Sequence, residues 1–258
     1  MRLLNSTAIL LGIAVLAVAT RIMAPGNLAW WNGVGLIFVL SGTLSALIFS
    51  YSLGEILRVF RIAVIVMGKK PITLDRYVSD IFELSIRVRR EGLLKSQEEI
   101  EALEDPFLKD GLNMLVDGYT SAETRWILEQ RSRHQHLREL LEARMFRSMS
   151  RYAPAFGGLA ALLSLSFQAQ AAGPFAALTP MFGPALLPLG YGLLLSHLVF
   201  IPVAERLERR AELRNQLMQL IVEGVVMIND SWHPAKTREA LDSFLPAGQR
   251  KNAAESYT

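Results

Sequence analysis

The chain has 258 residues, of which 51% are apolar and 20% are charged, with a formal net charge of +3 and a mean hydropathy of +0.28. It is too apolar for an ordinary soluble domain and too charged for a fully embedded one, so the two characters must be segregated along the sequence. Acidic and basic residues are mixed, which argues against a nucleic-acid partner, and the absence of cysteine excludes disulfides and thiolate chemistry.

Four apolar windows approach or reach the roughly twenty residues that a membrane-crossing helix needs. They are residues 3–20, 31–53, 152–170 and 183–202. Arg2 before the first window also fits a secretory signal, but no clean cleavage site precedes a polar domain and a second window follows at once, which favours a retained helix.

The windows predict an all-α integral membrane protein with four transmembrane helices. We expect residues 1–54 to hold helices 1 and 2, 55–151 a cytoplasmic helical domain, and 152–204 helices 3 and 4. The remainder, 205–258, is expected to form cytoplasmic C-terminal helices and a disordered tail.

The charge distribution predicts the orientation. Of 27 Lys and Arg residues, 17 lie in 54–151 and 8 in 203–258. Since positive charge is enriched on the inner side, both segments should face the cytoplasm beside anionic membrane lipid, with both termini inside. Trp30 and Trp31 then lie at the outer interface, which suits an indole.

Helix two carries small residues that either permit close packing against a neighbouring helix or reflect the composition of membrane helices generally: Gly33, Gly35, Ser41, Gly42, Ser45 and Ala46. After it, residues 55–67 stay apolar except for Arg58 and Arg61. This pattern predicts a helix leaving the membrane along its inner surface, with the arginines toward the headgroups.

The tract 71–151 has apolar residues at three- and four-residue steps, which predicts a helical bundle. Asp117 and Gly118 end one helix, and Thr120 with Glu123 has the spacing of a capping box that opens the next. That helix, 121–150, leads directly into the third membrane helix, so we expect one continuous rod. Helix four likewise extends through 205–229, followed by a short amphipathic helix over 236–244.

No catalytic constellation is present, so the chain is not expected to be an enzyme or to hold a cofactor or metal. His134 and His136 are two residues apart on a charged helix and therefore do not share a face. The mixed-sign cluster around Arg89 and Glu98 is either a solvated helical face or a docking surface matched by charge.

The membrane windows 152–170 and 183–202 contain no Asp, Glu, Lys or Arg. Ion carriers normally hold an ionisable group at membrane depth, so a conducting protein of this kind must take its carboxylate from a partner. His197 is the titratable exception, and packing near the inner interface is favoured over proton relay. Pro154, Pro188 and Pro202 each remove a helical hydrogen bond and predict kinks or loosened backbone.

An ordered set of strings resembles the MotA/PomA family of flagellar stator subunits, within the MotA/TolQ/ExbB proton channel superfamily. In chain order the strings are SGTLS at 41–45, RREGLL at 89–94, EEIE at 98–101, DPFLKDGLNMLVDG at 105–118, RWIL at 125–128, APAFG at 153–157, YGLLLSHLVFIPVAERL at 191–207, EGVVMIND with HP at 223–234, and LDSFLP at 241–246. The order of membrane and cytoplasmic segments is also similar to that family.

The resemblance implies an ion-driven stator subunit in the bacterial inner membrane. Five copies would surround two helices of a MotB-like partner that supplies the ion-binding Asp, and the cytoplasmic domain would engage the flagellar rotor protein FliG. The implied rotor-contact residues are Arg89, Arg90, Glu98, Glu99 and Glu101. The implied channel-lining residues are Pro154, Ala161, Ser164, Leu189, Tyr191, His197 and Pro202.

The sequence departs from the family at several of these positions. Ala161 and Leu189 stand where the family usually has threonines, His197 where it has Asn, and Ser96-Gln97 where it has Leu-Glu. A methyl or isobutyl group cannot coordinate a dehydrated sodium ion, so the departures favour protons.

Two alternatives remain. One is a TolQ/ExbB-like energy transducer for a non-flagellar envelope machine, against which the paired helices before the large domain argue. The other is a non-conducting membrane scaffold, which the missing hydroxyls favour.

Overall fold

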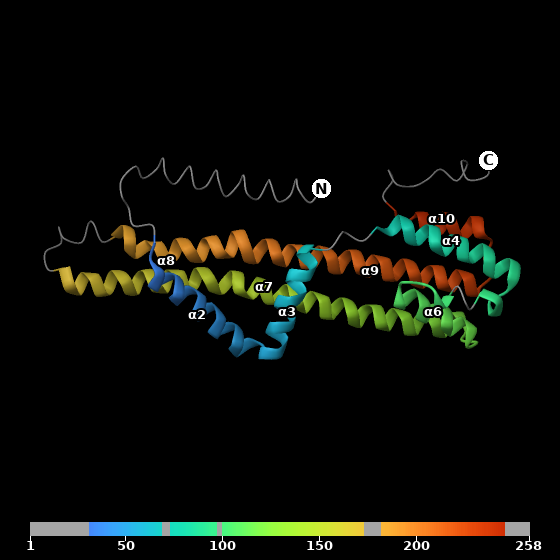
Figure 1. Cartoon of the computed structure of the whole chain (residues 1–258), viewed down its shortest axis with the longest axis horizontal. Coiled ribbons are helices and arrows are strands. Elements are labelled where there is room, and N and C mark those ends of the chain that lie inside the picture. Colours follow the sequence, from blue (N-terminus) through green and yellow to red (C-terminus); the bar gives the residue numbers. More distant parts are fainter. Residues whose placement is uncertain (1–30, 69–72, 97–99, 173–181, 246–258) are drawn as a thin grey trace. The chain divides into compact units, whose positions relative to one another are not determined.

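The computed structural model describes residues 31–68, 73–96, 100–172 and 182–245, and within these ranges the chain is helical, with no strands (Figure 1). The first predicted membrane helix and the predicted C-terminal tail lie outside the described residues. The longer helices are α2 (Gly33–Ser50), α3 (Leu53–Gly68), α4 (Leu74–Glu91), α6 (Pro106–Val116), α7 (Ser121–Ala172), α8 (Phe182–Leu194), α9 (Ile201–Asn229) and α10 (Pro234–Asp242). Two short ones are η1 (Leu94–Ser96) and the π-helix η4 (Leu195–Phe200).

The chain divides into two compact units. The first contains residues 1–46 and 151–196, and the second contains 47–150 and 197–258. Helix α7 contributes to both, because its 52 residues run without interruption from the charged tract into the third apolar window. The predicted continuous rod is therefore confirmed.

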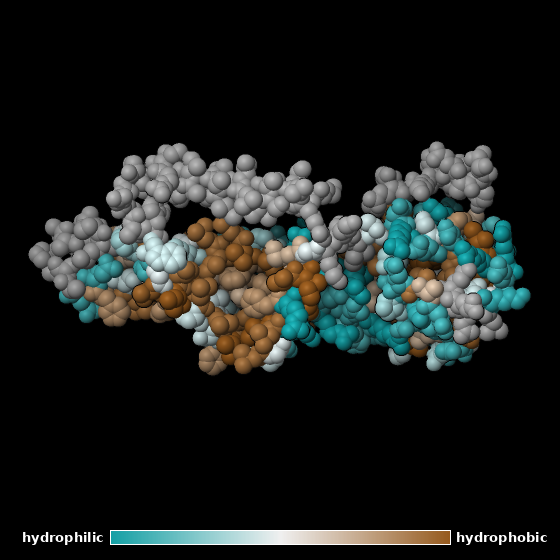
Figure 2. Space-filling view, viewed as in Figure 1, coloured by the Kyte–Doolittle hydropathy of each residue, from teal (hydrophilic) through white to brown (hydrophobic). Residues whose placement is uncertain are grey.

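Two helices of the described chain are long and apolar enough to cross a membrane, Gly33–Ser50 and the continuous helix Phe182–Asn229. Only 22% of each apolar window is buried. The remaining apolar side chains form the surface of α2 and α8, whereas hydrophilic residues dominate the surface of α4 and α10 (Figure 2). A surface of this kind suits lipid, since an aqueous surface rarely exposes large contiguous apolar patches.

The second unit is built around α9, which packs against α4, α6 and α10 (Figure 1). Its core consists of buried aliphatic side chains at helical spacing, including Val78, Ile81, Ile100, Leu108, Leu112, Leu128, Leu220, Ile221, Val225 and Leu241. Ion pairs join α7 to α9 beside this core. Arg125 forms a two-pronged pair with Glu223, and Arg147 forms another with Glu208.

Local capping signals set the helix ends in this unit. The Asp105 side chain accepts hydrogen bonds from Phe107 N and Leu108 N at 2.9 and 3.2 Å and opens α6. Gly118, with φ of 82°, follows its end. The predicted capping box is confirmed: Thr120 N donates to Glu123 Oε2 at 3.0 Å and Glu123 N donates to Thr120 Oγ1 at 3.3 Å.

The last helix was predicted two residues too late. It spans Pro234–Asp242 rather than 236–244. Proline suits the first turn of a helix because its missing N–H has no intrahelical partner there, so Pro234 begins the helix instead of preceding it. His233 caps it, with Nδ1 accepting from Ala235 N at 3.3 Å.

Candidate functional site

Helices α7 and α8 of the first unit approach until their backbones touch. A Cβ built on Gly192 would lie 2.4 Å from the carbonyl oxygen of Ala153, and one built on Gly157 would lie 2.7 Å from that of Pro188. Real Cβ atoms essentially never come so close to backbone atoms. The two glycines therefore set the distance between the helices, as small residues do where lipid gives no hydrophobic drive for association.

A stripe of small buried residues continues this contact along each helix. On α7 the stripe has four-residue spacing, with Ala153, Gly157 and Ala161, and on α8 and its extension it contains Ala185, Gly192 and Ser196. Sequence reasoning missed this contact. The spacing of Ala153, Gly157 and Ala161 is the small-xxx-small pattern of packed membrane helices, and that signal was available.

Helix α2 packs within the same unit. Asn32 N donates to the Tyr191 hydroxyl oxygen at 2.9 Å. Gly35 lies against the Pro188 ring, and Gly42 lies against the Phe156 ring, with the built Cβ 2.4 Å from the nearest ring atom in each case. The close-packing interpretation of the small residues in this helix is confirmed at these two positions.

The predicted channel-lining residues of the first unit differ in exposure. Ala161 is 3% exposed, so the chain itself covers its methyl group. Pro154, Ser164, Leu189 and Tyr191 are half-buried. Tyr191 and Leu189 lie near the contact between α7 and α8, since Gly157 approaches the Leu189 backbone. That these five residues line a channel stays a prediction.

The remaining two predicted lining residues lie at the π-helix η4. His197 is inside it and exposed, and Pro202 is the second residue of α9 and also exposed. Proline cannot donate a hydrogen bond to the preceding turn, and its ring crowds the carbonyl four residues earlier. A wider turn just before Pro202 agrees with the loosened backbone predicted there, although a π-helix itself was not predicted.

The predicted rotor-contact residues lie in the second unit where they can be described. Arg89 and Arg90 are exposed in the last turn of α4, where positive charge is favoured by the helix dipole. Glu98 and Glu99 lie outside the described residues. Glu101 is exposed, and its backbone oxygen accepts from Lys109 Nζ at 3.0 Å.

Two carboxyl groups of the second unit have pKa values shifted in opposite directions. Hydrogen bonds from Arg147 hold the pKa of Glu208 below its usual value. Burial raises the pKa of the half-buried Glu142. Where the chain is described, no group of three or more His, Asp or Glu side chains is placed to bind a metal ion.

The described residues combine closely packed apolar helices with a charged helical bundle, and known proteins share this combination. The model of the MotA/TolQ/ExbB proton channel family matches residues 99–220. Motility protein A of Bacillus subtilis is 27% identical over 250 residues, covering 96% of this chain and 92% of that protein. Chemotaxis protein PomA of Vibrio alginolyticus is 28% identical over 221 residues, covering 83% and 84%.

The fold agrees with these matches. The structure of the flagellar MotAB stator complex from Bacillus subtilis contains a chain that superposes with a TM-score of 0.83 at 25% identity, covering 93% of this chain and 96% of that one. The match to the MotA/TolQ/ExbB proton channel family covers residues 99–220. The chain is similar to the motility protein A and PomA subunits along most of its length.

Proposed function

We propose that the chain is the stator subunit of a bacterial flagellar motor, working with a MotB-like partner to convert a proton current into torque. The observation that carries the proposal is its likeness, over 93% of its length, to the chain of a flagellar stator complex. In this assembly four helices of each copy cross the inner membrane, and both termini are cytoplasmic.

The apolar helix pair supports a shared ion path. Residues 152–170 and 183–202 contain no Asp, Glu, Lys or Arg, so an ion-binding carboxylate has to come from another chain. A MotB-like single-helix protein with a membrane Asp supplies it, and five copies of the present chain surround two such helices. The backbones of α7 and α8 touch at Gly157 and Gly192, so each copy presents a rigid helix pair to the ion path.

The ion is a proton in this proposal. A dehydrated sodium ion needs several oxygen ligands, and Ala161 and Leu189 offer none where relatives carry hydroxyls. Protons need only water and a carboxylate. The departures at these two positions therefore change the ion and leave the mechanism intact.

The exposed end of α4 supports contact with the rotor protein FliG. Arg89 and Arg90 are exposed there, and Glu101 is exposed nearby in the chain. Arg89, Arg90 and Glu101 give this region charges of both signs, and mixed charge of this kind selects a charged partner and its orientation.

Swimming tests the proposal. The chain and its MotB-like partner are expressed together in a strain without its own stator, and motility and cytoplasmic pH are followed as the proton motive force is collapsed. We expect motility that follows the proton gradient and ignores sodium. Failure of both rotation and proton entry would remove the motor function, and proton entry without rotation would indicate an energy transducer for another envelope machine.

Variants at Ala161 sharpen the same test. Ala161→Thr restores the hydroxyl of relatives and should preserve swimming. Ala161→Glu places a carboxylate without a partner in a buried site and should abolish assembly or conduction. If Ala161→Glu swam normally, the placement of this residue beside the ion path would be wrong.

A further inference from the structure

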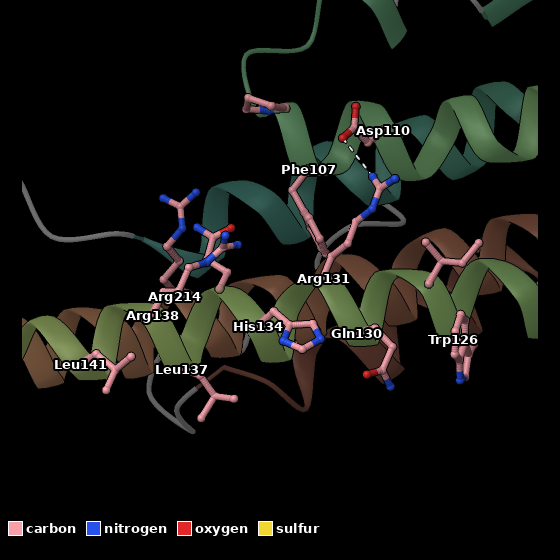
Figure 3. Close-up of a pocket in the computed structure, with 13 residues that line it drawn as sticks. Phe107, Asp110, Trp126, Gln130, Arg131, His134, Leu137, Arg138, Leu141 and Arg214 are labelled. Carbon is pink, nitrogen blue, oxygen red and sulfur yellow. Dashed lines mark hydrogen bonds and ion pairs between the residues drawn. The ribbon is translucent and has the colours of Figure 1, made fainter. Parts of the chain in front are cut away.

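The helix pair α7 and α9 carries an apolar groove with basic edges. The groove has a volume of about 830 Å³ and is bordered by Pro106 and Phe107 of α6. In Figure 3, Leu137 and Leu141 project from one side of α7, Arg138 and Arg214 lie close together, and Arg131 turns toward Asp110. We call this surface the basic groove, defined by Trp126, Leu137, Arg138, Leu141 and Arg214.

The apolar residues of the basic groove are unusually exposed for a segment outside the membrane windows. Trp126 is 65% exposed, Leu137 48% and Leu141 52%. Among the described residues, Arg138 forms no ion pair. An exposed tryptophan and two leucines beside an unpaired arginine have the composition of an interface, in which aromatic residues and arginine are enriched.

A second hollow on the same helix pair is acidic. It has a volume of about 730 Å³ and is lined by residues of α9 and one of α7, namely Leu140, Glu205, Glu208, Arg209, Glu212 and Leu213. Glu208 is paired with Arg147, Glu212 Oε2 lies 3.9 Å from His136 Nε2 of α7, and Glu205 makes no ion pair with the described residues. We call this surface the acidic face.

The basic groove and the acidic face point in opposite directions. Residues two positions apart on an α-helix are separated by about 200° around its axis. Arg214 and Glu212 therefore leave α9 on different sides and reach α7 at Glu139 and His136, respectively. Arg138 and Leu140 likewise leave α7 on different sides. One copy of the chain thus has complementary surfaces on its two sides.

The acidic face lies level with the end of the basic groove that contains Leu137, Arg138 and Leu141. Arg214 pairs with Glu139 at 3.3 Å, and Arg147 pairs with Glu208, which fixes the antiparallel register. By that register Glu212 lies level with Arg138 to within about a turn of helix. A rotation about an axis parallel to the helices would bring the two charges together.

We propose that the basic groove receives the acidic face of a second copy of this chain. The interface is heterologous, because two different surfaces meet, and repeated use of such an interface closes a ring. The inference deepens the proposed stator assembly by assigning the contacts between its copies outside the membrane. Leu137 and Leu141 are covered by the neighbour, and Arg138 gains the Glu212 side chain as a partner.

Charge reversal tests the pairing. The full chain, purified in mild detergent with its MotB-like partner, is weighed by native mass spectrometry. Arg138→Glu and Glu212→Arg should each weaken association about fivefold or more, and the double variant should restore it. Glu239→Arg, an exposed reversal on α10, is the matched control and should change nothing. Single reversals without effect, or a double variant that stays dissociated, would overturn the pairing.

Disulfide crosslinking supplies an independent readout, because the chain has no cysteine of its own. Leu141→Cys combined with Glu212→Cys should, on oxidation in isolated membranes, give a ladder extending beyond dimers, while each single variant gives monomers. Dimers from Leu141→Cys alone would indicate like surfaces meeting and overturn the proposal. If the wild-type chain supports swimming but the double cysteine variant gives no ladder, the interface is refuted and the motor function stands. If the ladder forms but the wild-type chain does not support swimming, the motor function is refuted and the interface stands.

Discussion

The two units of the chain hold their helices together by opposite means. In the first, α7 and α8 meet through Gly157 and Gly192, and large apolar side chains such as Leu162 and Phe167 are left exposed. In the second, large aliphatic side chains are buried between the helices, and charged side chains surround them. The difference follows from the solvent that each surface suits.

In water, burying a Leu or Ile side chain contributes about 1.5–3 kcal/mol, so a core of large residues holds a bundle. In lipid this gain is lost, and helices associate through close van der Waals contact, which small residues permit. Both kinds of packing occur along α7. Its large aliphatic residue Leu128 is buried in the second unit, and its small residue Gly157 is buried in the first. The substitutions below test whether each rule applies only in its own unit.

Truncation of the core of the second unit should have the largest effect. Leu220 is fully buried in the aliphatic core, so Leu220→Ala should lower the free energy of unfolding by about 2–5 kcal/mol through lost burial and a cavity. Gln219→Ala, exposed on the same helix, should be close to neutral. Thermal unfolding of the purified full chain, followed by tryptophan fluorescence, measures both, and equal melting temperatures would contradict the core assignment.

Enlargement of a glycine in the first unit should come next. Gly192→Ala puts a methyl group 2.4 Å from a backbone oxygen, which cannot move aside as a flexible side chain would. We expect a loss of about 1–3 kcal/mol and reduced accumulation in membranes. Gly190→Ala is the matched control, because nothing lies within 4 Å of its built Cβ. Membrane yield and protease resistance of the two variants should therefore separate clearly.

Short-range sequence patterns predicted helix ends in the second unit correctly. Thr120 with Glu123, and Asp117 with Gly118, are contacts between near neighbours in the chain, so their spacing carries the information. Pro234 shows the limit of such reading, since proline both interrupts helices and begins them. The relation of Pro234 to α10 depends on the turn that precedes it, in which His233 provides the cap.

The contacts between distant residues were harder to read. The four-residue spacing of Ala153, Gly157 and Ala161 is visible, but only the structure shows that Gly192 is the residue opposite. The position of the π-helix Leu195–Phe200 before Pro202 depends on how the whole helix packs against its neighbours, so it could not be predicted from local sequence. The basic groove requires α6, α7 and α9 together, and in the sequence Leu137 and Leu141 are isolated apolar residues in a charged tract.

A helix cap should give a smaller effect confined to the second unit. Asp105→Ala removes the acceptor for Phe107 N and Leu108 N and should cost about 1 kcal/mol. Asp105→Asn keeps an acceptor oxygen and should retain most of that stability. The Tyr77 hydroxyl also donates to Asp105 at 3.0 Å, and burial with the nearby carboxylate raises the pKa of Tyr77 to about 12. Alkaline titration of tyrosine absorbance should show this pKa decreasing in Asp105→Ala, and an unchanged titration would refute the contact.

The smallest effect is expected where α7 meets α9 at the pair Arg147 and Glu208. Both side chains are partly exposed, so Glu208→Gln should cost only about 0.2–1 kcal/mol at neutral pH. The pKa of Glu208 is lowered by Arg147, so its stabilisation is complete above the ordinary value of 4.5 and is lost as the pH falls through the lower value in the folded chain. The melting temperatures of wild type and Glu208→Gln should therefore converge as the pH drops below 4.5. If the melting temperatures of the two proteins differed by the same amount down to the lowest pH, the variant would disturb packing rather than charge. Charged side chains around the aliphatic core would then not stabilise the second unit at this position.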